Sequence, residues 1–312
     1  MKIVNDLDQF FEMDEELFVF GAGSFGYWIG YYLDRCGIDY CGYIDRAADD
    51  MTGETPCYGK RAVSLKAFRG EDGKQIRVII GMTDYQAAVF ELVKAENDYG
   101  ISVICVVNEY YDRYYKTYRC NINKFLSYFR RKLVVNDRVS IVANSCFGSI
   151  TYSLLGIPAM SPTIDFGICA EEYIRLCENP EYYFSKELTD FQMGRQFIAY
   201  NNFQSNGMWC KCGDIRLYCG HDVKQEYIVN RWDYLRKRVN YDNMAWILTD
   251  LMDRIDREVL ERFRKLSGRK MIVTTRVPVE AEGIDSYFVP EIYEYWKKPY
   301  EFWMDLVEWI NR

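Results

Sequence analysis

The chain has 312 residues and a net charge of −7, a length typical of two domains and a charge that does not favour a nucleic-acid binder. It contains no stretch of about 18 apolar residues, and residues 1–16 lack the apolar run of a signal peptide, so we expect neither a membrane span nor secretion. The eleven cysteines then indicate free thiols in a reducing cytoplasm.

The N-terminal third alternates strand and helix patterns. This order is typical of a parallel sheet with right-handed crossovers. We therefore predict a Rossmann-like domain over residues 1–118, followed by a connector over 119–137 that ends in a short helix. The predicted strands cover 17–21, 40–45, 77–81 and 101–107, and the predicted helices cover 24–37 and 84–100.

The rest of the chain, residues 138–312, predicts a second α/β domain with a mixed sheet and an aromatic helical tail. A helix over 144–155 follows the first strand, and Gly156 lies past its end, as is common at helix C-termini. The predicted strands cover 138–143, 196–203, 214–220, 244–250 and 270–275, and the further helices cover 170–179, 223–240, 256–268 and 291–312.

A glycine-rich loop, "FVFGAGSFG", lies between the first predicted strand and helix. In such a G-x-G-x-x-G motif Gly21 permits the turn, Gly23 leaves room for a phosphate, and Gly26 lets helix and strand pack closely. Asp45 ends the next strand, where an acid can accept from a ribose hydroxyl. The alternative is a tight turn without a ligand. The candidate cofactor-binding residues are Gly21, Gly23, Ser24, Phe25, Gly26 and Asp45.

The cofactor is expected to be a nucleotide or a nucleotide-sugar, with NAD as the alternative. A dinucleotide normally lies across two half-domains, and we count only four strands before the connector. The stretch "YCGYIDRAADDMTGETPCYGKRAVSL" also resembles the N-terminal domains of bacterial sugar acyltransferases. The similarity rests on Gly42 to Asp45, Gly53, Gly59, Val63 and Ser64, and it implies a glycine loop that contacts a nucleotide-sugar.

Residues 138–277 resemble a bacterial family of exopolysaccharide-biosynthesis proteins whose chemistry is unsettled. The similar segments are "SIVANSCFGSITYSLLGIPAMSPTID", "GDIRLYCGHD", "RWDYLRKRVNYDNMAWILTD" and "KMIVTTRVP". This chain departs from the family at Phe147 to Ser149, where a tryptophan and paired glycines are usual. It also has "TDLMD" at Asp250 and Asp253 in place of D-x-D, which weakens a metal-dependent glycosyltransferase interpretation.

Cys146 and His221 form a candidate nucleophile and base. Cys146 lies at a predicted helix start, where the dipole lowers a thiol pKa, and His221, the single histidine, ends a later strand beside Asp222. This order is similar to that of papain-like cysteine peptidases. The alternative is that both are structural residues. Zinc binding is not expected, because the spacing of Cys210, Cys212, Cys219 and His221 differs from common zinc motifs.

We expect a cytoplasmic protein of surface-polysaccharide biosynthesis, a transferase that acts on a small molecule or a glycan intermediate. The alternatives are a non-catalytic nucleotide-sugar-binding scaffold, a Cys–His acyltransferase or hydrolase, and an NAD-dependent oxidoreductase; a homo-oligomer stays open. No metal is expected. The candidate catalytic residues are Cys146, His221 and Asp222, and the candidate substrate-binding residues are Asn144, Ser161, Thr163, Arg231, Arg238 and Asp250.

Overall fold

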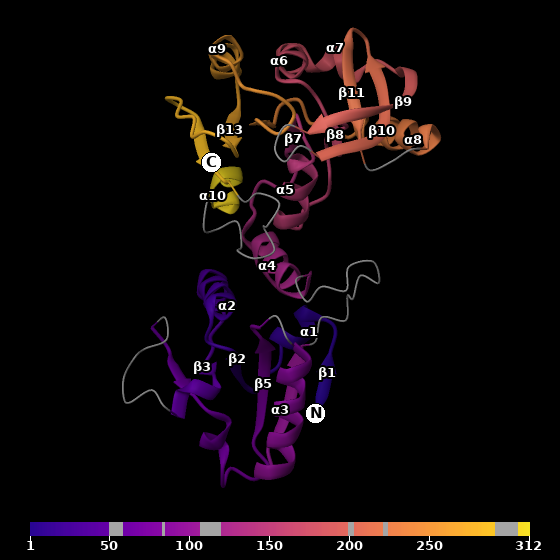
Figure 1. The fold of residues 1–312 in the computed structure, drawn as a ribbon. Helices are drawn as coiled ribbons and strands as arrows, with labels where there is room; N and C mark the ends of the chain where they lie inside the picture. The colour runs from indigo at the N-terminus through magenta and orange to yellow at the C-terminus, as the bar shows by residue number, and fades with distance from the viewer. Residues whose placement is uncertain (50–58, 83–84, 107–119, 199–202, 221–223, 291–304) are drawn as a thin grey trace. The chain divides into compact units, whose positions relative to one another are not determined.

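The computed structural model describes residues 1–49, 59–82, 85–106, 120–198, 203–220, 224–290 and 305–312 (Figure 1). The chain divides into two compact units, Met1–Leu133 and Val134–Arg312, each with its own sheets and core. The predicted α/β class is confirmed, since the first unit has a parallel sheet and the second adds sheets of both orientations. Within the described part of the chain, no helix is long and apolar enough to cross a bilayer.

The first unit is built around a six-stranded parallel sheet of order β1-β6-β5-β2-β3-β4. The expectation of four strands is therefore wrong, because the three-residue strands β1 and β4 were missed at the two edges. The strand order reverses between β2 and β5, which is where ligands bind in sheets of this kind. The elements are β1 Lys2–Val4, α1 Leu7–Phe11, β2 Glu16–Phe20, α2 Ser24–Arg35, β3 Gly42–Ile44, the 3₁₀ turn Arg46–Asp49, β4 Arg61–Val63, the 3₁₀ turn Leu65–Phe68, β5 Gln75–Ile80, α3 Tyr85–Tyr99, β6 Ser102–Val106 and α4 Cys120–Leu133.

Helices cover both faces of this sheet, and the alternation of side chains along β2 explains why. Leu17 and Val19 pack with α2, whereas Phe18 and Phe20 pack with α3. Successive strand residues point to opposite faces, so a continuous apolar run indicates burial on both sides. The helix α4, in the predicted connector, adds Phe129 and its neighbours to the α2 core and so belongs to the first unit.

The second unit contains a parallel sheet of order β14-β13-β12-β7. On one face α5 packs against β7, where a Cβ at Gly148 would lie 3.0 Å from the Cβ of Ala143. On the other face Val142 and Leu248 share a core with α6, α8 and α9. The elements are β7 Ser140–Ala143, α5 Phe147–Leu155, β8 Phe166–Gly167, α6 Ala170–Glu178, α7 Pro180–Phe184, β9 Leu188–Ile198, β10 Phe203–Cys212, β11 Ile215–Cys219, α8 Gln225–Arg236, β12 Met244–Thr249, α9 Arg257–Lys265, β13 Arg269–Thr274, β14 Asp285–Phe288 and α10 Leu306–Asn311.

An antiparallel sheet of order β8-β11-β10-β9 completes the second unit. The single strand predicted over 196–203 is not observed: Ile198 ends β9, Phe203 begins β10, and these two strands pair with each other as a long hairpin. Residues 199–202 lie outside the described part of the chain. Near its base β10 pairs with β11 from Met208 to Cys212. Its outer part, Phe203 to Gly207, pairs with β9 alone among the described strands. The hairpin therefore continues beyond the edge of its own sheet.

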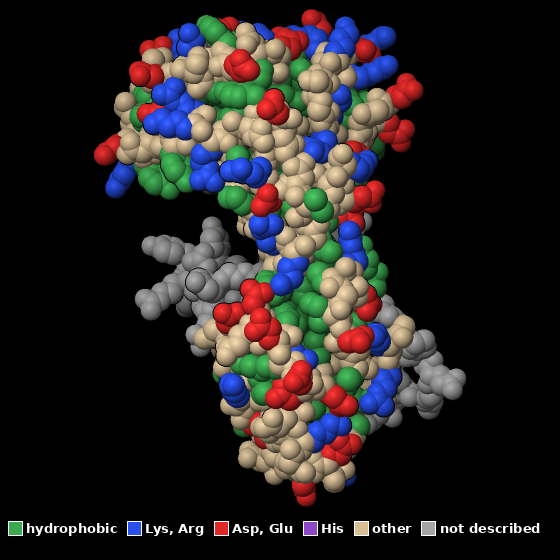
Figure 2. All heavy atoms as spheres, turned by 180° about the vertical axis from the view of Figure 1, so that it is seen from behind, with side chains coloured by type: hydrophobic (Ala, Val, Ile, Leu, Met, Phe, Trp, Pro, Cys, Tyr) green, Lys and Arg blue, Asp and Glu red, His purple; other side chains and the backbone are tan. Residues whose placement is uncertain are grey.

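The surface carries both signs of charge. On the face drawn in Figure 2, acidic and basic side chains are interspersed over each unit. This distribution agrees with the modest net charge of −7.

Candidate functional site

The loop between β2 and α2 has the backbone that its three glycines predict. Gly21 has a φ of +97°, which favours glycine, and its N–H donates to the carbonyl oxygen of Ile44 at 2.7 Å. A Cβ on Gly26 would lie 1.9 Å from the carbonyl oxygen of Gly21. A Cβ on Gly23 would meet no described heavy atom within 4 Å. The loop is thus tightly packed at Gly21 and Gly26, and there is open space at Gly23.

A fourth glycine, which the sequence analysis did not identify, closes this loop from the neighbouring strand. Gly81 follows β5, and its N–H donates to the carbonyl oxygen of Phe20 at 2.8 Å. A Cβ on Gly81 would lie 3.0 Å from the Cα of Gly26. The two strands between which the sheet order reverses are therefore both followed directly by a glycine. The available sequence signal was a glycine directly after the apolar run "RVII".

The carboxylate of Asp45 fixes the glycine loop to the end of β3. Its Oδ2 accepts from the N–H of Ala22 at 2.7 Å, and its Oδ1 accepts from the N–H of Ala47 at 2.9 Å. An ionised carboxylate has about four acceptor sites, so each oxygen keeps capacity for a further donor. Phe25, in the first turn of α2, is partly buried and packs against the α2 core, and its predicted contact with a cofactor stays a prediction. The side chain of Ser24 lies outside the described atoms.

In the second unit, polar side chains gather at the carboxyl ends of the parallel strands. Asn144, after β7, is fully buried; its Oδ1 accepts from the N–H and hydroxyl of Thr249 at 2.8 and 2.9 Å, and its Nδ2 donates to that residue's carbonyl at 2.9 Å. Asp250, after β12, accepts from the N–H and hydroxyl of Thr275 and the N–H of Arg276 at 2.9 to 3.1 Å. These two predicted substrate-binding side chains tie strand ends together.

Ser161 and Thr163 are also directed into the second unit. Both are buried, their hydroxyl oxygens lie 3.0 Å apart, and the hydroxyl of Thr163 accepts a long bond of 3.4 Å from the N–H of Ala143. These contacts fix the 161–163 loop against β7, beside Asn144. The structure thus brings three of the predicted substrate-binding residues together as a buried polar layer.

Cys146 lies at the start of α5, as the sequence predicted, but it occupies the N-cap position itself in place of Asn144 or Ser145. Burial, and then the Asp165 carboxylate, raise the pKa of Cys146 to about 11. This direction is opposite to the lowering expected at a helix start, because burial disfavours the charged thiolate. His221 and Asp222 lie outside the described residues, so their predicted approach to Cys146 stays a prediction.

Arg231 of α8 connects the surroundings of Cys146 with the end of β11. Its guanidinium pairs with the carboxylate of Asp165 at 3.4 Å and also lies 3.4 Å from the Sγ of Cys219. It stacks on the ring of Phe166, 5.6 Å from the centroid. Asp165 itself has a φ of +60°, unusual for a residue other than glycine. Arg231 therefore holds a specific position between three segments.

Arg238, in the turn after α8, extends a row of alternating aromatic and cationic side chains that begins on this helix. It lies over the ring of Tyr234, 5.1 Å from the centroid, and Arg231 lies over Tyr227 at 5.8 Å. The spacings of four and three residues place Tyr227, Arg231 and Tyr234 on one face of α8, and Arg238 follows in the turn after the helix ends at Arg236. Both tyrosines are more than half exposed. Rings and guanidinium groups in this order form a surface suited to anionic, stackable ligands.

The cysteines near the β10–β11 turn do not form a metal site with the described residues. Cys210, Cys212 and Cys219 are buried, and burial raises the pKa of Cys210 and of Cys212 to about 12. No group of three potential ligands among histidine, cysteine, aspartate and glutamate occurs in the described part of the chain. These thiols therefore act as small apolar side chains of the sheet.

Two comparisons with known proteins bear on the site. Residues 115–311 match a family described as a domain of unknown function, DUF1919. An uncharacterised protein of Haemophilus influenzae is 23% identical over 207 residues, which cover 63% of this chain and 93% of that protein. The family match includes the second unit and leaves the glycine loop outside it.

Proposed function

The chain belongs to the DUF1919 family of domains of unknown function, and from the geometry of its sites we propose that it binds a nucleotide-sugar at the glycine loop and acts as a transferase in surface-polysaccharide biosynthesis. In this proposal the first unit is Rossmann-like and holds the donor, and the second unit meets the glycan intermediate. The protein works in the cytoplasm, where nucleotide-sugars are available.

The observation that carries the proposal is that each of the three loop glycines meets a different structural requirement of a phosphate-binding loop. A phosphate-binding loop needs one glycine for the turn, one without a side chain toward the phosphate, and one for close packing of the helix. Gly21, Gly23 and Gly26 meet these needs in that order, by a positive φ, by open space and by a 1.9 Å approach to a carbonyl oxygen. The N-terminus of α2 then supplies free N–H groups to the anion.

The residues of the site indicate the sugar and the base of the ligand less specifically than its phosphate. The remaining acceptor capacity of Asp45 suits a ribose hydroxyl, which nucleotides, nucleotide-sugars and NAD all carry. With six strands in the sheet, the low strand count no longer disfavours NAD. A nucleotide-sugar remains the first choice from the sequence resemblance, and NAD is the alternative that the experiment must separate.

In the second unit, the α8 row supports a role in holding a phosphorylated intermediate. Arg238 offers a guanidinium to phosphate oxygens, and the exposed Tyr227 and Tyr234 offer rings for a sugar. The guanidinium of Arg231 is mostly buried and paired with Asp165, so its role here is to hold the row in place. The alternative of a Cys–His acyltransferase or hydrolase is weaker, because a thiol with a pKa of about 11 is protonated at neutral pH.

A thermal-shift comparison of UDP-glucose, GDP-mannose, UDP, NAD and acetyl-CoA tests the proposal. A ligand at about 100 times its Kd should stabilise the wild-type protein by about 2.7 kcal/mol. Gly23→Val should abolish that stabilisation and leave the unliganded Tm unchanged, because its backbone is extended and a Cβ there meets no described atom.

Ala67→Val, at an exposed position of the same unit, is the matched control and should bind like the wild type. A nucleotide-sugar shift that survives Gly23→Val would mean that the loop is only a turn. A larger shift with NAD that Asp45→Ala abolishes would favour the oxidoreductase instead.

A further inference from the structure

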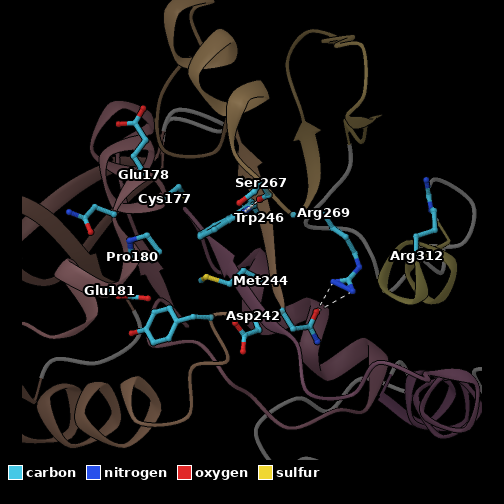
Figure 3. A pocket seen from close by; sticks show the side chains of 14 residues that line it. Cys177, Glu178, Pro180, Glu181, Asp242, Met244, Trp246, Ser267, Arg269 and Arg312 are labelled. Atoms are coloured by element: carbon cyan, nitrogen blue, oxygen red, sulfur yellow. Dashed lines mark hydrogen bonds between the residues drawn. The ribbon is translucent and has the colours of Figure 1, made fainter.

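A pocket of about 760 Å³ opens at the amino ends of β12 and β13 in the second unit (Figure 3). Its volume lies within the usual range for small-molecule sites. One wall comes from the segment that joins α6 to α7, and the other comes from residues 241–244 and 267–269. None of these residues is part of the glycine loop or of the carboxyl-edge polar layer.

The floor of the pocket is apolar and rigid. Met244 and Trp246 belong to the main core of the unit, and the indole Nε1 of Trp246 donates to the carbonyl oxygen of Ser267 at 2.7 Å. Gly268 has a φ of +87°, and a Cβ there would lie 2.8 Å from the carbonyl oxygen of Met244. The backbone therefore closes tightly over the indole, and the pocket is formed before any ligand arrives.

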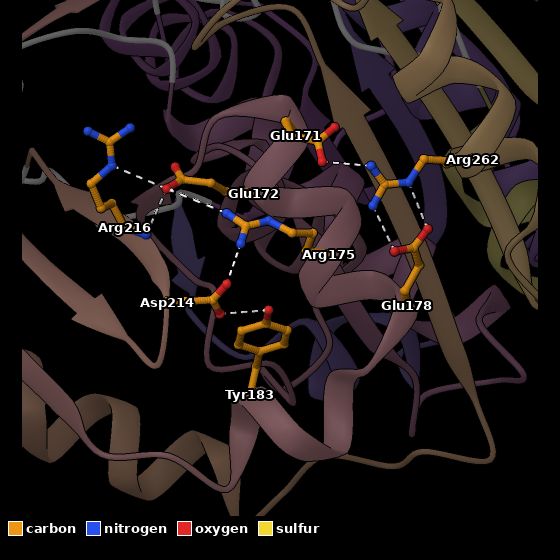
Figure 4. Close-up of polar contacts among 8 residues, drawn as sticks. All are labelled: Glu171, Glu172, Arg175, Glu178, Tyr183, Asp214, Arg216 and Arg262. Atoms are coloured by element: carbon orange, nitrogen blue, oxygen red, sulfur yellow. Dashed lines mark hydrogen bonds and ion pairs between the residues drawn. The ribbon is translucent and has the colours of Figure 1, made fainter.

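Two of the charged side chains on the walls are neutralised within the protein. Glu178 receives two hydrogen bonds from Arg262, at 2.9 and 2.8 Å, so its charge is compensated (Figure 4). Arg312 pairs with Asp285 at 3.0 Å. Neither side chain is left to bind a charged ligand.

Three other charged side chains of the pocket walls remain available to a ligand. Glu181 and Asp242 are exposed and have no ion pair with any described residue. Arg269 donates from both terminal nitrogens to the Oδ1 of Asn243, at 2.9 and 3.1 Å, which fixes its orientation without neutralising it (Figure 3). The pocket thus presents acceptor-only carboxylates and a donor-only guanidinium together.

We propose that this pocket binds a neutral saccharide. An anionic ligand would meet the carboxylates of Glu181 and Asp242, and a cationic ligand would meet Arg269, so either sign is repelled by part of the wall. A sugar hydroxyl donates one hydrogen bond and accepts two, so neighbouring hydroxyls satisfy carboxylate and guanidinium groups at once.

Tyr241 supplies the apolar contact that a sugar ring needs. Its side chain is 39% exposed, and its ring rests at 6.5 Å from the ring of Phe184, which limits its motion. Burial and the nearby Glu181 carboxylate raise the pKa of Tyr241, so the phenol stays a hydrogen-bond donor beside an acceptor. A pyranose can place its C–H face on this ring and its hydroxyls toward the charged walls.

The occupant is the neutral part of the glycan intermediate, and in this respect the inference rests on the proposed function. The two sites are separate, however, so their tests can be separated. Gly23→Val should lose nucleotide-sugar binding and keep saccharide binding, whereas the pocket variants should do the reverse. If the wild-type protein binds a saccharide but no nucleotide-sugar, the proposed function fails alone; if it binds a nucleotide-sugar but no saccharide, the present inference fails alone.

The experiment is saturation-transfer NMR with maltotriose, cellotriose and triacetylchitotriose, next to trigalacturonic acid and triglucosamine as charged probes. At least one neutral trisaccharide should bind, and more tightly than either charged probe. Tyr241→Ala should weaken that binding about fivefold or more, from the lost ring contact, and Tyr241→Phe should retain most of it. Asp242→Asn should weaken it and raise the relative binding of trigalacturonic acid.

The controls are Tyr182→Ala and Glu187→Gln, exposed residues nearby that do not line the pocket. They should leave binding unchanged. If Tyr241→Ala fails to fold, the exposed Asp242 variant still decides the matter. The proposal is overturned if no neutral trisaccharide binds, if the pocket variants bind like the controls, or if a charged probe binds best.

Discussion

In the parallel sheet of the second unit, the polar side chains at the carboxyl ends of the strands and those near the amino ends have opposite roles. At the carboxyl edge, Asn144 and Asp250 are buried and bonded to the ends of neighbouring strands. At the amino edge, Glu181 and Asp242 are exposed, and no described residue forms an ion pair with them. One edge therefore uses polar groups to hold the fold, and the other presents them to solvent.

This difference shows that polarity at a strand end does not by itself indicate a ligand site. A buried carboxylate needs donors, and at Asp250 the protein supplies them from Thr275 and Arg276. An exposed carboxylate is satisfied by water and remains free to bind. The residues with the strongest sequence signal stabilise the sheet, and those that line the pocket have no motif.

The largest expected effect is on stability at the carboxyl edge. Asp250→Ala removes the acceptor of three donors and should lower the free energy of unfolding by about 3 kcal/mol, because buried donors left unsatisfied cost about 1–3 kcal/mol each. Asp242→Ala at the amino edge should change it by less than about 0.5 kcal/mol. Urea unfolding of both variants measures these losses. Equal urea midpoints for the two variants would contradict the expected difference in stability.

A second prediction concerns Cys146 at the same edge. With a pKa of about 11, it should react with iodoacetamide roughly a hundredfold more slowly at neutral pH than an ordinary thiol of pKa about 8.5. Its rate should rise about tenfold for each pH unit as the thiolate forms. Peptide mass spectrometry over time measures both. Fast labelling at neutral pH would restore the Cys–His interpretation.

The smallest expected effect is at the salt bridge beside the pocket. Arg262 bonds Glu171 and Glu178 of α6, and its hydrogen bond lowers the pKa of Glu178 below the ordinary 4.5 (Figure 4). The pair is partly exposed, so Arg262→Ala should cost less than about 1 kcal/mol.

The pH dependence of that loss has a definite sign. A carboxyl whose folded pKa is lowered contributes stability above its unfolded value and loses it as pH falls through the folded value. The difference between wild type and Arg262→Ala should therefore shrink as pH falls below the ordinary glutamate pKa of 4.5, vanish below the lowered pKa of folded Glu178, and also shrink in high salt. A constant difference from neutral pH to acid would show that packing, and not charge, is responsible.

Most strands of the two parallel sheets could be predicted, and those that were missed in these sheets share one property. β1, β4 and β14 contain three or four residues and lie at sheet edges. An edge strand is paired on one side and half exposed, so it needs no apolar run. The continuous apolar strands β2, β5 and β12 are buried on both faces, which makes their signal strong.

Features of the candidate sites could be predicted where they are local in sequence and were missed where they depend on long-range contacts. Gly21, Gly23 and Gly26 lie within six residues, so their motif is visible in the sequence. Gly81 reaches them only through the pairing of β2 with β5. The pocket is assembled from segments more than sixty residues apart, around Glu181 and around Asp242, so no local pattern announces it.

The long β9–β10 hairpin implies that protection of backbone amides from hydrogen exchange falls along a single pair of strands. From Met208 to Cys212, β10 is held by neighbours on both sides, whereas from Phe203 to Gly207 it has β9 alone among the described strands. Two-stranded ribbons are marginally stable in water, so the outer half can open while the sheet below stays intact. Backbone amides of the outer hairpin should exchange with deuterium long before those next to β11, and the earliest local unfolding of this unit begins there.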